Sequence, residues 1–125
     1  MRFIYIVFIL SLSGYVNHTV AQPNDEVNPN GYNKFYYPNG AISSEGTLVN
    51  GKPDGIWKAY YENGKLKSEG NRINGKLEGV WKFFNEDGSI SAEYGYENGN
   101  KNGSQKEFYA NGKVRSNEPV VNGVK

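Results

Sequence analysis

Residues 59–82 read AYYENGKLKSEGNRINGKLEGVWK, and a similar order of aromatic, glycine and lysine positions recurs in the neighbouring blocks of 24 residues. Four Asn-Gly or Asp-Gly pairs mark this constant period: Asn39-Gly40, Asn63-Gly64, Asp87-Gly88 and Asn111-Gly112. A fixed period of about 20 to 50 residues is typical of repeat proteins, in which each unit packs on the next. The sequence therefore predicts an array of about four stacked units.

Each unit contains two turns. The first, as at Asn63-Gly64, joins two runs rich in strand-forming residues, which predicts a two-residue hairpin with positive φ at both turn positions. This register opposes Glu62 to Lys65, Tyr61 to Leu66, Tyr60 to Lys67 and Lys58 to Glu69. The second turn, as at residues 74–79, is richer in glycine, which favours a longer loop or a bulge.

The same register predicts how the units pair. It opposes Lys34 to Glu45, Lys58 to Glu69 and Lys82 to Glu93, and each such pair contributes about 0.2 to 1 kcal/mol. An isolated hairpin is marginal in water, so the hairpins should pair edge to edge. Glycine and asparagine interrupt the chain too often for a helical period. The predicted fold class is all-β, a single elongated antiparallel meander of β-hairpins.

Strand alternation sorts the side chains onto two faces. We expect one face to carry Trp57, Ala59, Tyr61 and Leu66, repeated by Trp81, Phe83 and Ile90. The other face is rich in lysine and glutamate, with an aromatic stripe of Tyr36, Tyr60, Phe84 and Phe108. The stripe either packs internally against lysine stems, which we favour, or forms an exposed ladder for a protein or glycan. The candidate partner-binding residues are the stripe together with Trp57 and Trp81.

The third unit departs from the pattern, because Gln105 stands at the tryptophan position and Ser104 at the preceding aliphatic position. We expect these changes to mark a fraying or capping end of the array.

The first residues have the layout of a secretory signal peptide. Arg2 precedes an apolar run over residues 3–12, and Thr19-Val20-Ala21 stands before Gln22. The apolar run is about half of the roughly 20 residues that a membrane span needs, which disfavours an uncleaved anchor and stable membrane insertion. We predict a signal peptide at 1–21, a polar leader at 22–26 and a repeat domain at 27–125. The expected location is exported: periplasm, cell surface or extracellular.

Composition narrows the possible chemistry. Removal of the predicted signal peptide takes away Arg2 and leaves thirteen basic and thirteen acidic side chains. The net charge is then near zero, so no broad electrostatic field favours binding to nucleic acid. The chain has no cysteine, and its single histidine, His18, lies in the signal segment, which removes histidine-assisted nucleophiles and the usual transition-metal sites. The repeated glutamates face lysines, which favours ordinary ionised carboxylates. We expect no enzymatic activity, no metal and no cofactor.

The strings DGIWKAYYENGKLKSEG (residues 54–70) and EGVWKFFNEDGSISAE (residues 78–93) resemble the bacterial variant of the MORN repeat, the membrane occupation and recognition nexus motif. The resemblance covers about residues 27–124 and implies a meander of hairpins. Bacterial members of this repeat type are often labelled antitoxins, whereas eukaryotic members are scaffolds or membrane-apposition modules. We expect a non-enzymatic module that binds another protein, with an antitoxin or immunity partner and a glycan-binding module as alternatives.

Overall fold

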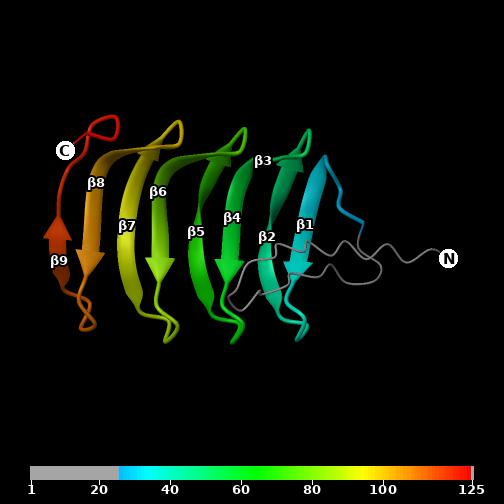
Figure 1. Cartoon of the computed structure of the whole chain (residues 1–125), viewed down its shortest axis with the longest axis horizontal. Coiled ribbons are helices and arrows are strands. Elements are labelled where there is room, and N and C mark those ends of the chain that lie inside the picture. Colours follow the sequence, from blue (N-terminus) through cyan, green and yellow to red (C-terminus); the bar gives the residue numbers. More distant parts are fainter. Residues whose placement is uncertain (1–25, 125) are drawn as a thin grey trace, which may run out of the picture.

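The computed structural model describes residues 26–124, and these form one antiparallel sheet without helices. The strands are β1 (Gly31–Tyr36), β2 (Ile42–Val49), β3 (Lys52–Pro53), β4 (Gly55–Tyr60), β5 (Leu66–Ile73), β6 (Lys76–Phe84), β7 (Ile90–Glu97), β8 (Asn100–Phe108) and β9 (Val114–Asn117). They pair in chain order, β1-β2-β4-β5-β6-β7-β8-β9, with the short β3 paired to β2. Figure 1 shows this single layer, with the turns in two rows, one at each end of the strands. The predicted meander is confirmed.

The two kinds of turn are the reverse of the prediction. The two-residue turns with positive φ are Asn50-Gly51, Asn74-Gly75, Asn98-Gly99 and Asn122-Gly123. At the other end of the strands, the Tyr61 amide donates to the Lys65 carbonyl, so Glu62, Asn63 and Gly64 form a three-residue loop. Only Gly64 of that loop has positive φ, and the Asn63 side chain accepts a hydrogen bond from the Lys65 amide. The side-chain bond holds the loop without a left-handed asparagine.

The longer loop shifts the register next to the turn. Tyr60 opposes Leu66 and Ala59 opposes Ser68, so Lys67 is an extra residue in a bulge. The predicted pairs Glu62 with Lys65, Tyr61 with Leu66 and Tyr60 with Lys67 are therefore wrong. The bulge offsets the extra loop residue, which restores the predicted register from Ala59 onwards.

All three predicted lysine–glutamate pairs are consequently confirmed, as Lys34 opposite Glu45, Lys58 opposite Glu69 and Lys82 opposite Glu93.

A second irregularity lies beside the tight turns at Asn74-Gly75 and Asn98-Gly99. Between the pairs Glu69 with Lys82 and Asn71 with Glu78, only Gly70 lies opposite residues 79–81. The expected bulge of this region is therefore present, but it lies in the strand after a tight turn and not in a long loop. Its extra residues bring the Trp81 side chain over Gly70.

The tryptophans pack on glycines of the preceding strand. A Cβ atom on Gly46 would lie 2.4 Å from Trp57, and one on Gly70 would lie 2.3 Å from Trp81. The indole Nε1 of Trp57 donates to the Thr47 carbonyl at 3.0 Å. The indole Nε1 of Trp81 makes the equivalent bond one period later, to the Asn71 carbonyl at 2.9 Å. Trp81 is 4% exposed and belongs to the small core. Glycine is required at these two positions because the indole occupies the space of a side chain.

Hydrogen bonds join consecutive units in both rows of turns, at the two ends of the strands. The Tyr37 hydroxyl donates to the Tyr60 carbonyl and the Tyr61 hydroxyl to the Phe84 carbonyl, both at 2.6 Å. In the row of tight turns, the glycine amide of each turn donates to a carbonyl of the preceding unit. The donors are Gly51, Gly75, Gly99 and Gly123. These bonds repeat at the period of the sequence and hold each hairpin to the next.

The third unit keeps the strand pattern of the second, and its role as a fraying or capping end of the array stays a prediction. Strand β8 has nine residues, as many as β6. Gln105 is 7% exposed, and its Nε2 donates to the Gly95 carbonyl at 2.9 Å. The glutamine amide thus replaces the indole N–H at the same position of the repeat.

Candidate functional site

The six candidate residues lie on opposite faces of the sheet. Trp57 and Tyr60 are an odd number of positions apart on β4, and so are Trp81 and Phe84 on β6, so their side chains alternate. One face, the tryptophan face, carries Trp57, Trp81, Phe35, Phe83 and Tyr94, whose rings contact at centroid distances of 5.6 to 6.5 Å. The other, the stripe face, carries Tyr36, Tyr60, Phe84 and Phe108. The structure therefore does not bring all six residues into one surface.

The four stripe residues are half-buried. Tyr60 opposes Leu66 and Phe84 opposes Ile90, so these aliphatic side chains lie beside the stripe and not beside the tryptophans as expected. The stripe thus has a packing role within the sheet, while part of each ring stays open to solvent.

A ladder of alternating charge runs across the stripe face. Each glutamate lies between two lysines on neighbouring strands, in the order Lys34, Glu45, Lys58, Glu69, Lys82, Glu93 and Lys106. Sequence reasoning found only one lysine for each glutamate, because the second pairing is made between hairpins. Among these seven described residues, no lysine ammonium lies within 4.0 Å of a glutamate carboxylate oxygen. The ladder is therefore a solvated pattern of charge, and exposed pairs of this kind add little stability.

One cluster on this face perturbs the ionisation of its members. The Tyr32 hydroxyl donates to Glu45, and this hydrogen bond, followed by burial, raises the pKa of Tyr32 to about 12. Burial first, then the same carboxylate, raises the pKa of Tyr60 to about 12. The hydrogen bond from Tyr32 lowers the pKa of Glu45 below its usual value, with Tyr60, Lys34 and Lys58 adding to the effect. Glu45 is thus an ionised acceptor and not a proton donor at neutral pH.

Exposed aliphatic side chains stand beside the charge ladder. Ile56 and Val80 are each 59% exposed and occupy the same position of successive units, and Tyr32, at 56%, occupies it one unit earlier. A shallow groove of about 430 Å³ lies between Ile56 and Val80, and Gly70 and Gly79 also line it. We call this feature the aliphatic groove. The sequence signal for it was an apolar column on a face otherwise rich in charge, and our sequence reasoning did not single it out.

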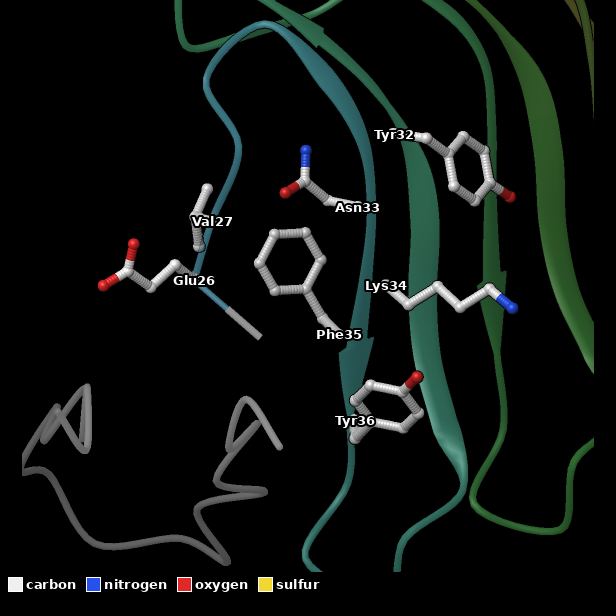
Figure 2. A pocket seen from close by; sticks show the side chains of 7 residues that line it. All are labelled: Glu26, Val27, Tyr32, Asn33, Lys34, Phe35 and Tyr36. Atoms are coloured by element: carbon white, nitrogen blue, oxygen red, sulfur yellow. The ribbon is translucent and has the colours of Figure 1, made fainter. Parts of the chain in front are cut away.

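A further hollow of about 260 Å³ follows the edge strand β1. Figure 2 shows Asn33 and Phe35 pointing to one side of β1 and Tyr32 and Lys34 to the other. Asn33 accepts a hydrogen bond from the Asn28 amide and donates to the carbonyls of Asn28 and Gly31. These bonds fold residues 26–30 against the edge, and Glu26 and Val27 line the hollow with β1. The N-terminal edge is thereby partly covered, which limits strand addition there.

No group of three or more acidic or histidine side chains among residues 26–124 could hold a metal ion. Asp87 accepts hydrogen bonds from the Ser89 amide and hydroxyl, so the Asn85–Gly88 segment is a turn closed by its own side chains. No helix in this part of the chain is long and apolar enough to cross a membrane. The predicted signal peptide and its cleavage after Ala21 lie outside the described residues.

Comparison with known proteins shows the family. The model of the MORN repeat variant matches residues 29–50, 53–74, 77–98 and 101–122, so the chain belongs to this family. The matched segments follow the hairpin period of the sheet. MORN repeats are generally scaffold modules that bind proteins or membranes, and the family is a non-enzymatic one. No curated protein and no solved structure matches the chain.

Proposed function

We propose that this protein is an exported, non-enzymatic scaffold that binds another protein through the stripe face. The observation that carries the proposal is the aliphatic groove, because Ile56 and Val80 expose apolar surface at the same position of consecutive units. Single exposed aliphatic residues are common on any protein, but a row of them around a groove is typical of an interaction site.

The surroundings of the groove suit a protein partner. Aromatic stripe residues provide apolar contact area beside it, and Lys58, Glu69 and Lys82 of the charge ladder offer both signs of charge. The alternation disfavours a partner of one strong charge, such as nucleic acid or an anionic lipid surface. Trp57 and Trp81 then act in folding on the opposite face, and their proposed part in binding is indirect.

The binding test uses crosslinking from two faces. A photoreactive residue in place of Val80 should capture one partner in cells that make the protein, and the same residue in place of Lys67, whose ammonium lies over the Tyr61 ring, should not. The double variant Ile56→Ser with Val80→Ser should lose the partner yet stay folded, since both side chains are exposed and Ser104 occupies the same column. Equal capture from both faces, or full capture by a folded double variant, would contradict the proposal.

The export part has its own test. It is supported by Arg2, the apolar run and Thr19-Val20-Ala21, together with a cysteine-free chain that needs no disulfides outside the cell. Mass spectrometry of protein recovered from outside the cytosol should give an N-terminus at Gln22. Recovery of the unprocessed chain from the cytosol alone would exclude export and leave the binding proposal standing.

A further inference from the structure

The charge ladder of the stripe face has one position on each strand of the meander. Eight strands follow one another between residues 31 and 117, with β3 outside this order. In strand order the positions are Lys34, Glu45, Lys58, Glu69, Lys82, Glu93, Lys106 and Asn117. None of these residues is buried, so a second molecule can reach all of them. Because the number of strands is even, the centre of the ladder lies between Glu69 on β5 and Lys82 on β6.

This centre makes the ladder complementary to itself. A two-fold axis parallel to the strands, between β5 and β6, brings a second copy face to face and reverses its strand order. Each ladder glutamate then lies opposite a lysine of the other copy. The pairs are Glu69 with Lys82, Glu93 with Lys58, and Glu45 with Lys106. Lys34 faces the neutral Asn117, so no two like charges of the ladder are opposed.

The ladder disfavours the other way of turning a second copy onto this face. A two-fold axis that runs along the ladder, across the strands, sets every strand over its own equivalent. Each lysine then meets the same lysine of the other copy, and each glutamate meets the same glutamate. Like charges that are directly opposed repel each other, which costs affinity for that orientation. The charge pattern thus favours one relative orientation of two copies.

The aliphatic groove fits the same arrangement. It lies between Ile56 on β4 and Val80 on β6, and Gly70 and Asn71 of the intervening β5 line it. Rotation about the strand-parallel axis keeps each side chain at its position along the strands and places β6 of one copy over β5 of the other. Val80 of each copy therefore lies over the groove of the other. Val80 and Ile56 are each 59% exposed, so both lose water on association.

The area of the face suits a dimer. Strands about 4.8 Å apart and roughly 20 Å long give the eight-stranded face on the order of 750 Å² per copy. Specific protein interfaces bury about 800 Å² per partner. Rotation about an axis parallel to the strands also preserves the twist of the sheet, so the strands of both copies stay aligned, as in packed sheets.

We infer that the partner of the stripe face is a second copy of this chain, bound in a symmetric face-to-face dimer with its axis between β5 and β6. The inference rests on the proposed function and names the partner of that surface. Exposed charge pairs set orientation more than affinity, and the apolar contact is confined to the groove. The expected dissociation constant is on the order of 10 µM, and it rises with salt because the ladder charges are screened.

The test exchanges charges between the two copies. Purified Glu69→Lys should dimerise at least about tenfold more weakly than the wild type, because its new lysine opposes Lys82 of the other copy. Purified Lys82→Glu should do the same, because its new glutamate opposes Glu69. An equimolar mixture should dimerise to within about threefold of the wild type, since every opposed pair again carries opposite charges. Analytical ultracentrifugation at about 50 and about 500 mM salt measures association, and circular dichroism checks the fold.

The matched control uses a neighbouring ladder pair whose members do not meet across the axis. The new lysine of Glu45→Lys opposes Lys106, and the new glutamate of Lys58→Glu opposes Glu93. Each variant should dimerise weakly, and mixing the two should restore nothing. If a variant of the first pair does not fold, Glu93→Lys and Lys58→Glu replace that pair, because these positions do meet across the axis.

Several outcomes would overturn the inference. They are a wild type that stays monomeric up to about 1 mM, single variants that dimerise normally, and equal recovery in the test and control mixtures. The photoreactive residue at position 80 separates this inference from the proposed function. Capture of a second copy supports both. Capture of a different protein alone overturns the second-copy inference and leaves the scaffold function standing, and capture of no protein removes both.

Discussion

Gly70 is the position where the structure makes the most specific energetic prediction. A methyl group there would lie 2.3 to 2.5 Å from three atoms of the Trp81 ring, which is rigid and 4% exposed. The ring must move, with an overpacking cost of about 1 to 3 kcal/mol. It also loses the 2.9 Å hydrogen bond from Nε1 to the Asn71 carbonyl, worth about 0.5 to 1.5 kcal/mol. We expect Gly70→Ala to lower the free energy of unfolding by roughly 2 to 4 kcal/mol.

The matched control is Gly64→Ala, which separates steric overlap from backbone strain. Gly64 has a φ of 86° and no atom near its would-be Cβ, so its cost should be about 1 to 2 kcal/mol from the left-handed backbone alone. Gly70 is not among the residues with positive φ, so its cost should come from the indole. Urea unfolding followed by circular dichroism measures both variants.

A second background decides the cause. In protein that already carries Trp81→Gln, which copies the third unit, Gly70→Ala should cost less than about 1 kcal/mol because the ring is gone. An unchanged cost in that background would refute the reasoning.

The remaining predictions concern the turns and the tyrosines. Asn74→Gly should leave stability nearly unchanged, because glycine adopts the observed φ of 52° freely. Asn63→Gly should lower the free energy of unfolding by about 1 kcal/mol, because two side-chain hydrogen bonds are lost. Thermal unfolding that ranks the two variants the other way would contradict the turn assignment. The raised pKa of Tyr32 and Tyr60 implies a stabilisation that is complete below pH 10 and is lost as the pH rises towards about 12. Glu45→Gln should lower the pKa of Tyr32 more than that of Tyr60, because the carboxylate is the largest cause only for Tyr32. NMR titration of the ring carbons measures this, and equal shifts would count against it.

Sequence reasoning reached part of the candidate site. The parity of positions along a strand separated the aromatic stripe from the tryptophans correctly, because successive side chains alternate whatever the neighbouring strands do. It did not identify the aliphatic groove or the hydrogen bond from Gln105 to the Gly95 carbonyl. Both depend on which residues of different units meet, and that follows from the bulges beside Gly70 and Gly95.

The 24-residue period and the all-β class were determined by the sequence alone, since they rest on a repeat without insertions and on frequent glycine and asparagine turns. The lysine–glutamate pairs within each hairpin were predicted correctly, but their register holds only because a bulge offsets the extra loop residue. The choice between two turn types was not determined by the sequence, because an Asn-Gly pair fits both a tight turn and a three-residue loop closed by its asparagine. Contacts between neighbouring units decided the turn type. In the three-residue loop, the Tyr61 hydroxyl and the Asn63 side-chain amide donate to carbonyls of the next unit. In the tight turn, the Gly75 amide donates to a carbonyl of the preceding unit. Contacts between units are properties of the assembled sheet, and no single unit of sequence contains them.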